Sequence, residues 1–371
     1  MNTWTKTTIG DLCDTISDTY RGNDSEVVLI NTSDVLNGKI LNHDFVLNKN
    51  LKGQFKKTFQ KDDILYSEIR PVNKRFAYVD FEETSCYIAS TKLMVLRPRK
   101  NKVEPRFLFH ILTAPNMLAE MQHLAETRSG TFPQITFLSE LAPTSVMLPD
   151  LETQKKIVSV FDVIERKIDL NNAINDNLEQ QAQALFDENF PNISNGANTV
   201  GDYIVPKRGK GLLSKNAIFG DVPVVAGGLE PSTYHNVANT QAPVIAISAS
   251  GANAGYVSLW SIPIWSSDSS YIDSSMTDDV FFWYVFLKKR QQEIFDAQTG
   301  SAQPHIYPQH IAAMPIYEVN QKDITNYTEQ VTPMFKLIGY NKEEIQRLIQ
   351  LRDTLLPKLM SGELDVSTIE L

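Results

Sequence analysis

The chain has 371 residues, of which 42% are hydrophobic and 21% are charged, and its formal net charge is −9. This composition excludes an intrinsically disordered chain and leaves enough length for two or three domains with hydrophobic cores. The two cysteines, Cys13 and Cys86, are too few for a disulfide framework, and no cluster of Cys and His has the spacing of zinc ligands.

No secretory signal is expected, because the first residues, MNTWTKTTIGDL, contain no apolar segment. The longest apolar run, residues 280–287, is too short to cross a bilayer. We therefore expect a soluble, cytoplasmic protein without membrane contacts. The acidic total weakens an interpretation as a nucleic-acid-binding protein but does not exclude it, since only the contacting face must be positive.

Residues 1–149 predict a first domain that mixes strands and helices. Short apolar runs bounded by polar residues predict strands at 63–69, 77–81 and 92–98. The segment 104–112 predicts a helix that follows these strands.

A long helix is predicted over residues 150–191. Asp150 follows Pro149 and is expected to be its N-cap, with polar side chains in the first turn. Mostly apolar side chains then recur at alternating steps of four and three residues, which is the heptad spacing of a coiled coil. The main positions of this seam are Ile157, Phe161, Ile164, Ile168, Asn171, Leu178 and Leu185.

Residues 192–319 predict a second mixed domain, with the linker NISNGAN at 192–198. Strands are expected at 244–250 and 255–260, and a helix is expected at 279–295. These elements follow one another in the same order as those of the first domain.

A second long helix is predicted within residues 320–371. Pro333 interrupts its early part, so we expect a kink or a new start with Thr332 as cap. Leu356-Pro357 and Gly362 are expected to end the helix. Its seam continues through Ile338, Asn341, Ile345, Leu348 and Leu355.

Two short phrases occur twice, once in each half of the chain. They are TIGDL at 8–12 with TVGDY at 199–203, and TRSGTFPQITFL at 127–138 with TGSAQPHIYPQHI at 299–311. The helical positions keep a nearly constant offset of about 170 residues, as between Asn171 and Asn341. The sequence therefore predicts an α+β fold with a pseudo-twofold internal repeat, in which two α/β domains are separated by two long antiparallel coiled-coil helices. Asn171 and Asn341 would lie at matched seam positions and fix the register, or alternatively face solvent on a bent helix.

The sequence resembles, over essentially its whole length, the specificity (S) subunit of type I restriction-modification systems. The residues that carry the resemblance are LPDLETQKKI at 148–157 with its helix, LIQLRDTLLPKLMSGELDV at 348–366, GSAQPHI at 300–306 and the two domain openings. Their order and their repetition at a fixed spacing are more specific than any one phrase. The second helix departs from the pattern, since it reads EVNQKD at 318–323 where the first reads PDLETQ.

The resemblance implies that each domain is a target recognition domain that reads one half of a bipartite double-stranded DNA site. It implies that the helices are a spacer and a dock for two methyltransferase (modification) subunits, in a complex that can also hold restriction/translocase subunits. S-adenosylmethionine, ATP and Mg²⁺ would then belong to the partner subunits, and this chain would bind no cofactor.

Candidate DNA contacts are basic, amide and hydroxyl residues that cluster in loops. Arg and Asn can pair with guanine and adenine edges, whereas Lys mostly meets phosphate. We expect the loops 70–75 and 250–254 to occupy equivalent places, although a solvated surface loop is the alternative for each. Arg128 is expected to be structural. The candidates are Lys56, Lys57, Arg70, Asn73, Lys74, Arg75, Lys207, Arg208, Lys210, Ser250 and Asn253.

No motif in the sequence predicts catalysis. There is no phosphate-binding loop and no Asn/Asp-Pro-Pro-aromatic tetrad of an amino-methyltransferase. Pro149-Asp150 followed by Glu165-Arg166-Lys167 imitates a nuclease pattern, but about 22 Å of helix separates the two carboxylates, so they cannot share a metal. The alternatives to a DNA-reading subunit are a scaffold that joins partner proteins and a self-contained nuclease or methyltransferase.

Overall fold

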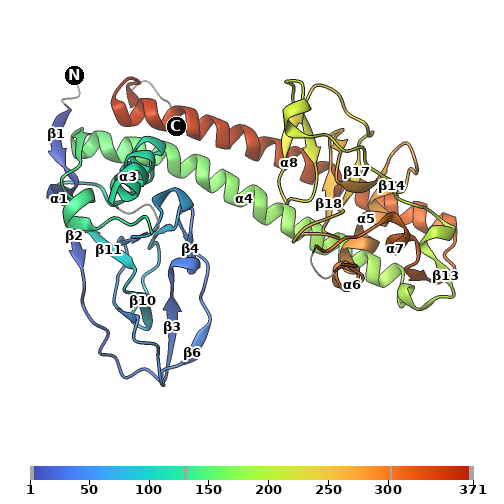
Figure 1. The fold of residues 1–371 in the computed structure, drawn as a ribbon, viewed down its shortest axis with the longest axis horizontal. Coiled ribbons are helices and arrows are strands. Elements are labelled where there is room, and N and C mark those ends of the chain that lie inside the picture. The colour runs from blue at the N-terminus through green and yellow to red at the C-terminus, as the bar shows by residue number, and fades with distance from the viewer. Residues whose placement is uncertain (1–3, 129–131, 301–302, 367–371) are drawn as a thin grey trace. The chain divides into compact units, whose positions relative to one another are not determined.

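The computed structural model describes residues 4–128, 132–300 and 303–366 (Figure 1). The chain forms two compact units, one of residues up to Arg166 together with those from Leu348 onward, and one of residues 167–347. Both units contain α-helices and β-sheets, as the sequence predicts. The two long helices, α4 (Leu151–Asn189) and α8 (Gln321–Ser361), each contribute to both units.

The first unit contains two four-stranded sheets. The antiparallel sheet has the order β2-β11-β8-β9, and the mixed sheet has the order β6-β3-β10-β7. Residues from both sheets form one core, in which Val28, Leu65 and Val95 are fully buried. The strands are β1 (Thr5–Thr8), β2 (Cys13–Ile16), β3 (Glu26–Ile30), β4 (Val35–Leu36), β5 (Lys39–Ile40), β6 (Phe45–Leu47), β7 (Phe55–Lys57), β8 (Ile64–Ser67), β9 (Phe76–Tyr78), β10 (Tyr87–Ser90), β11 (Leu93–Pro98) and β12 (Ser145–Leu148). Its shorter helices are α1 (Ile9–Leu12), α2 (Pro105–Thr113) and α3 (Pro115–Arg128), with the 3-10 turns η1 (Thr32–Asp34) and η2 (Pro71–Asn73) and the π-turn η3 (Phe137–Leu141).

The second unit contains an antiparallel sheet of order β14-β20-β17-β18 and a three-stranded sheet of order β16-β15-β19. The strands are β13 (Asn198–Thr199), β14 (Lys207–Arg208), β15 (Val222–Val225), β16 (Thr233–His235), β17 (Val244–Ser248), β18 (Val257–Trp260), β19 (Trp265–Ser266), β20 (Ser269–Asp273) and β21 (Pro315–Ile316). The helices are α5 (Val280–Lys289), α6 (Gln291–Asp296) and α7 (Pro308–Ala312), with the 3-10 turns η4 (Ile193–Asn195), η5 (Val200–Asp202) and η6 (Ser214–Asn216).

Two predictions for the second domain need correction. The single helix expected at 279–295 is two helices, because Arg290 leaves helical geometry (φ −101°, ψ 21°) and its guanidinium donates to the Pro315 carbonyl at 2.6 Å. The segment expected to be a linker, 192–198, is anchored to the domain. Ile193 is buried, and its carbonyl accepts from the Tyr317 N–H at 2.9 Å.

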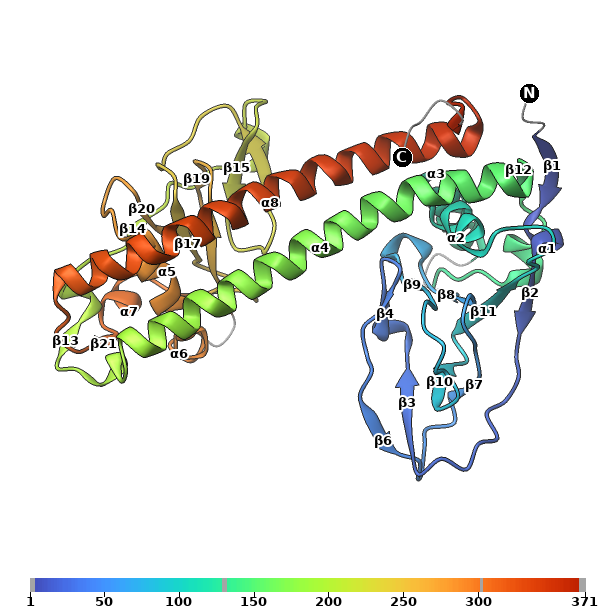
Figure 2. The ribbon, with the colours of Figure 1, turned by 180° about the vertical axis from the view of Figure 1, so that it is seen from behind.

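Within the second unit, α4 and α8 lie side by side and run antiparallel (Figure 2). The Tyr327 hydroxyl of α8 donates to the Ala182 carbonyl of α4 at 2.8 Å, and the Asn341 amide donates to Asn175 Oδ1 at 2.8 Å. Around these contacts, apolar seam residues are buried against the domain core, among them Ile338 at 5% exposure. The heptad pattern therefore predicts the contacting faces of the two helices correctly in this unit.

The predicted pairing of the seam asparagines is wrong by one helical turn. Asn341 bonds to Asn175, while Asn171 donates to Glu344 Oε2 at 2.7 Å, and Lys167 lies 3.3 Å from the same carboxylate. Asn171 and Asn341 are 1% and 8% exposed, so the alternative of solvent-facing asparagines is also wrong. The other seam positions are buried or half-buried: Ile157, Phe161, Ile164 and Ile345 are buried, and Ile168, Leu178, Leu185, Leu348 and Leu355 are half-buried.

The start of α4 confirms Asp150 as its N-cap, because its carboxylate accepts from the Thr153 N–H and hydroxyl at 3.0 Å each. The new start expected in α8 is wrong, since the helix continues through Pro333. Buried Val331 and Phe335 flank this proline, and their packing offsets the one backbone hydrogen bond that it removes. Pro357 also lies inside α8, which ends at Ser361 before Gly362 at φ +75°.

Among the described residues, no helix is both long and apolar enough to cross a membrane.

The buried Asn175–Asn341 pair predicts that a single and a double substitution change the free energy of unfolding differently. Asn341→Ala should lower the free energy of unfolding by about 1–3 kcal/mol, because it leaves the buried Asn175 amide without a partner. Replacing both asparagines by leucine should be close to neutral or stabilising, since no polar group is then left unsatisfied. Urea denaturation of the two variants measures this difference, with the exposed Asn172→Ala as control. A double variant as unstable as Asn341→Ala would contradict the expectation.

His110 in α2 predicts a pH dependence of stability. Its ring is buried beside Phe109 and Phe161, its Nε2 has no hydrogen-bond partner among the described residues, and burial lowers its pKa to about 4. Between pH 6.5 and 4 the unfolded chain therefore binds a proton that the folded chain does not, so stability falls as pH falls. Denaturation curves at pH 7 and 4 should show that His110→Leu loses about 3 kcal/mol less than the parent chain over this range. Equal losses of unfolding free energy in the variant and the parent chain would contradict this prediction.

Candidate nucleic-acid interface

The repeated phrase holds a loop in each domain with the same two backbone hydrogen bonds. In the first domain, the Arg70 N–H donates to the Pro133 carbonyl at 3.1 Å, and the Ile135 N–H donates to the Glu68 carbonyl at 2.9 Å. In the second, Gly251 donates to Pro304 at 3.1 Å, and Ile306 donates to Ala249 at 3.0 Å. The loops 70–75 and 250–254 therefore occupy equivalent places, as predicted. Residues 129–131 and 301–302 of the phrase lie outside the described residues.

The two domain openings also fold alike. The Gly10 N–H donates to the Ala142 carbonyl at 2.9 Å, and a Cβ on Gly10 would lie 3.1 Å from the Ala142 Cβ. A Cβ on the equivalent Gly201 would lie 3.2 Å from the Ala312 Cβ. In each opening a threonine hydroxyl donates to an aspartate three residues later. The Thr8 hydroxyl lowers the pKa of Asp11, and the backbone N–H and hydroxyl of Thr199 lower the pKa of Asp202.

The loop after β8 presents three polar side chains to solvent. Arg70 and Lys74, on either side of η2, have left-handed backbone conformations (φ 45° and 54°), and the Asn73 N–H donates to the Arg70 carbonyl at 2.9 Å. Arg70, Asn73 and Lys74 are exposed, and their side chains make no hydrogen bond or ion pair with the described residues. Arg75 differs, since its guanidinium donates to the Ser33 carbonyl at 2.9 Å. Arg75 thus anchors the loop, while the side chains of Arg70, Asn73 and Lys74 remain accessible to a ligand.

On β7, Lys56 and Lys57 have different surroundings. Lys56 is exposed, whereas the Lys57 ammonium donates to the Leu93 carbonyl at 2.8 Å, and partial burial lowers its pKa. Lys57 therefore binds the backbone of β11, a strand of the other four-stranded sheet, and Lys56 is the more accessible of the two candidates.

In the second domain, candidates from separate segments meet at Asp268. Arg208 Nη2 donates to Asp268 Oδ1 at 2.6 Å, and the Ser250 hydroxyl donates to Asp268 Oδ2. Lys207 and Lys210 are exposed on either side of Arg208. Asp268 carries no signal in the sequence, because 60 residues separate it from Arg208 and no motif surrounds it.

The candidate Asn253 and the expected structural residue Arg128 both bond within their own domain. The Asn253 amide donates to the Gly227 carbonyl at 3.5 Å, which is a weak contact. Arg128 lies 3.1 Å from Glu140, and that carboxylate also accepts from the Thr136 N–H at 2.6 Å. Arg128 is therefore a structural residue at the junction, as predicted.

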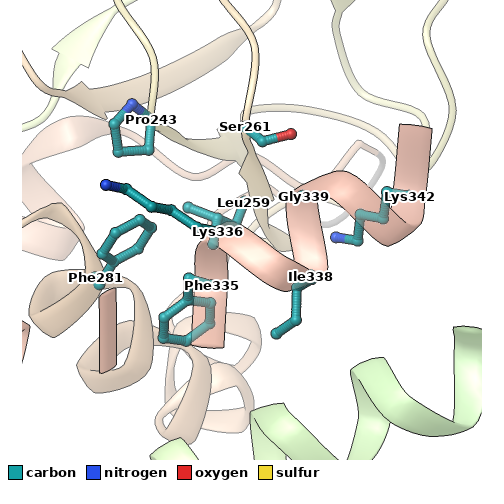
Figure 3. A pocket seen from close by; sticks show the side chains of 9 residues that line it. All are labelled: Pro243, Leu259, Ser261, Phe281, Phe335, Lys336, Ile338, Gly339 and Lys342. Atoms are coloured by element: carbon teal, nitrogen blue, oxygen red, sulfur yellow. The ribbon is translucent and has the colours of Figure 1, made fainter. Parts of the chain in front are cut away.

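The second unit contains a cavity of about 100 Å³ beside α8 (Figure 3). Its lining is mostly apolar, with two lysines and one serine as the polar side chains, so it lacks a carboxylate or imidazole for acid–base chemistry. The lining residues are Pro243, Leu259, Ser261, Phe281, Phe335, Lys336, Ile338, Gly339 and Lys342. No group of three or more His, Cys, Asp or Glu side chains that could hold a metal occurs in the described part of the chain.

The carboxylates of the nuclease-like pattern have separate structural partners. Asp150 caps α4, and its bonds with Thr153 lower its pKa. Glu165 lies 4.0 Å from Arg106 on α2, which also pairs with Asp162. The pattern therefore matches by chance.

Comparisons with known proteins agree on one family. Residues 1–180 match the family described as Type I restriction modification DNA specificity domain. The chain is 40% identical over 247 residues to the type I restriction enzyme HindI specificity subunit of Haemophilus influenzae, which covers 65% of this chain and 53% of that protein. It is 33% identical over 99 residues to the MjaIX specificity subunit of Methanocaldococcus jannaschii, covering 26% of this chain and 23% of that protein.

The chain thus spans about half the length of the more similar curated relative. Among solved structures, the S subunit of a type I restriction-modification system from M. genitalium has a similar fold, with a TM-score of 0.56 at 18% identity over 97% of this chain and 96% of that one. The repeated domain-and-helix organisation of the sequence agrees with these matches. The chain is therefore similar to type I restriction-modification specificity subunits, and the match to the family's DNA specificity domain covers residues 1–180.

Proposed function

We propose that this chain is the non-catalytic DNA-specificity subunit of a type I restriction-modification complex, in which each domain reads one half of a bipartite site. The observation that carries the proposal is the pair of loops held by identical backbone bonds in the two domains. The loops contain different residues, RPVNKR at 70–75 and GANAG at 251–255. The same backbone hydrogen bonds thus hold loops with two different sets of side chains, which suits the recognition of two different half-sites.

The exposed residues of the first loop have the chemistry of base and phosphate recognition. A guanidinium can bond guanine O6 and N7 together, an amide can do the same with adenine N6 and N7, and an ammonium neutralises phosphate. Arg70, Asn73 and Lys74 provide one of each within five residues. The left-handed residues on both sides of η2 restrict the loop, so little conformational entropy is lost on binding.

The long helices are the proposed dock for two methyltransferase subunits. In the second unit, α4 exposes Leu170 and Ile174, and α8 exposes Leu337 and Tyr340, the last at 68%. Exposed apolar side chains at helical spacing are typical of partner surfaces. S-adenosylmethionine, ATP and Mg²⁺ would be bound by the partners, with restriction/translocase subunits joining the same cytoplasmic complex.

The experiment that tests the proposal is single-molecule sequencing of adenine methylation in cells that contain the partner methyltransferase, with and without this chain. A split motif that appears only with the chain, and changes in one half when residues 192–320 are exchanged for those of a relative, supports it. A confirmed complex with no chain-dependent methylation would instead favour a scaffold that does not read DNA.

Variants of the first loop should separate affinity from specificity. Lys74→Ala should weaken binding of the assembled complex to all sequences and reduce the slope of log K against log[salt] by about one. Arg70→Ala or Asn73→Ala should instead relax the choice of base at one position, by roughly 10- to 100-fold in discrimination. Fluorescence titrations at several salt concentrations measure both effects, with the exposed Lys102→Ala, outside both long helices, as control. A base preference unchanged in both loop variants would show that this loop does not read sequence.

The isolated chain should bind DNA weakly and with strong salt dependence. Its net charge is −9, so a continuous positive channel requires the partner subunits. Titration of the purified chain with a duplex that carries the motif should show an affinity that falls steeply between 50 and 200 mM salt. Nanomolar, sequence-specific binding by the chain alone at physiological salt would contradict this.

A further inference from the structure

Asp268 is held by side chains from two separate segments of the second domain. Arg208 on β14 donates from Nη2 to one carboxylate oxygen at 2.6 Å, and Ser250, the first residue of the loop 250–254, donates to the other. The Ala249 N–H also donates to the Asp268 carbonyl at 3.1 Å. Both oxygens of the carboxylate are therefore engaged, and its orientation is defined.

The ion pair lies at the surface, where it adds little to stability. The side chains of Arg208 and Asp268 are 41% and 40% exposed, and exposed ion pairs contribute little to stability because solvent screens their charges. Among the described residues, the contact with Asp268 is the one hydrogen bond of the Arg208 side chain. A guanidinium has five N–H donors, so Nε and Nη1 keep donors for another partner.

The backbone of Arg208 is fixed by close packing of the next residue. Arg208 pairs with Ser270 in the β14–β20 register. A Cβ on Gly209 would lie 2.5 Å from Ser266 Oγ, and the Lys210 N–H donates to the Ser266 carbonyl at 2.9 Å. The guanidinium is thus positioned at its base by β14 and at its tip by Asp268.

We propose that Asp268 is a positioning residue that holds Arg208 for the recognition of a guanine in the half-site read by the second domain. This inference rests on the proposed function. A carboxylate beside Arg208 cancels its charge and repels phosphate, so the pair is poorly suited to binding the DNA backbone. The same carboxylate restricts the guanidinium, which favours the two-bond contact with guanine O6 and N7. The neighbouring Lys207 and Lys210 supply the phosphate contacts.

In the first domain, a different residue exposes the equivalent guanidinium. There, Arg70 itself occupies the position equivalent to Gly251, and its side chain has no ion-pair partner among the described residues. In the second domain the loop provides Ser250 instead, and the guanidinium comes from β14. The positioning by Asp268 is thus specific to the second domain.

The test uses the assembled methyltransferase complex and duplexes that carry its methylation motif. Each guanine of the second half-site is replaced in turn by 7-deazaguanine, which lacks the N7 acceptor. In the parent complex one replacement should reduce affinity roughly 10- to 100-fold. The same replacement should have little effect on Arg208→Ala, Arg208→Lys or Asp268→Ala, and Arg208→Ala/Asp268→Ala should discriminate no worse than either single variant.

Two variants separate recognition from charge. Arg208→Lys keeps the charge but loses the two-bond geometry, so it should lose guanine discrimination. Lys210→Ala removes a charge from the same segment, so it should weaken binding to all duplexes and keep the motif. Thermal unfolding identifies variants that have lost their fold.

The outcomes are distinguishable from failure of the proposed function. If the parent complex shows no chain-dependent motif, the proposed function fails. If a motif exists but its second half contains no guanine in either strand, or if folded Asp268→Ala and Arg208→Lys retain the parent response to 7-deazaguanine, the role of Asp268 and Arg208 is overturned.

Discussion

Two backbone hydrogen bonds per domain are the constraint on which the candidate interface depends. They join the segment at Pro133 to the loop at Arg70, and the segment at Pro304 to the loop at Gly251. Because main-chain atoms make these bonds, they place no demand on the side chains that the loops carry. The same frame can therefore hold Arg70, Asn73 and Lys74 in one domain and Ser250 in the other. A constant frame with variable side chains is what a protein needs when it presents two recognition surfaces.

The helices contribute a second constraint, which is specific to their register. Within the second unit the buried amides of Asn175 and Asn341 bond to each other, and Asn171 bonds to Glu344. An apolar seam alone would allow the helices to slide by a turn at moderate cost. A slide in this seam would separate buried polar groups from their partners, which is unfavourable by more than the bonds themselves contribute.

The sequence predicted the repeat, the positions of both long helices and the equivalence of the two loops, because these depend on local patterns and on phrases that occur twice. It predicted Asp150 as an N-cap for the same reason. Sequence-based prediction fails where contacts between residues far apart in the chain determine the structure. Tertiary packing carries α8 through Pro333, and the partner of Asn341 depends on how the two helices align in space. The basic run around Arg208 is visible in the sequence, but its contact with Asp268 is not, since Asp268 comes close to Arg208 only after β14, β17 and β20 have paired.

The close contact between each opening glycine and an alanine beyond the proline has a further consequence. Gly10 meets Ala142, and Gly201 meets Ala312, so the chain enters and leaves each domain at neighbouring points. The strand pairs β1–β12 and β13–β21 close these points. Residues between them can therefore be gained or lost without moving the start of the helix that follows. The interval from the opening glycine to the proline is indeed longer in the first domain than in the second. Each domain is built as an insert with adjoining ends, so its exposed loops can diverge or be replaced while the two long helices stay unchanged.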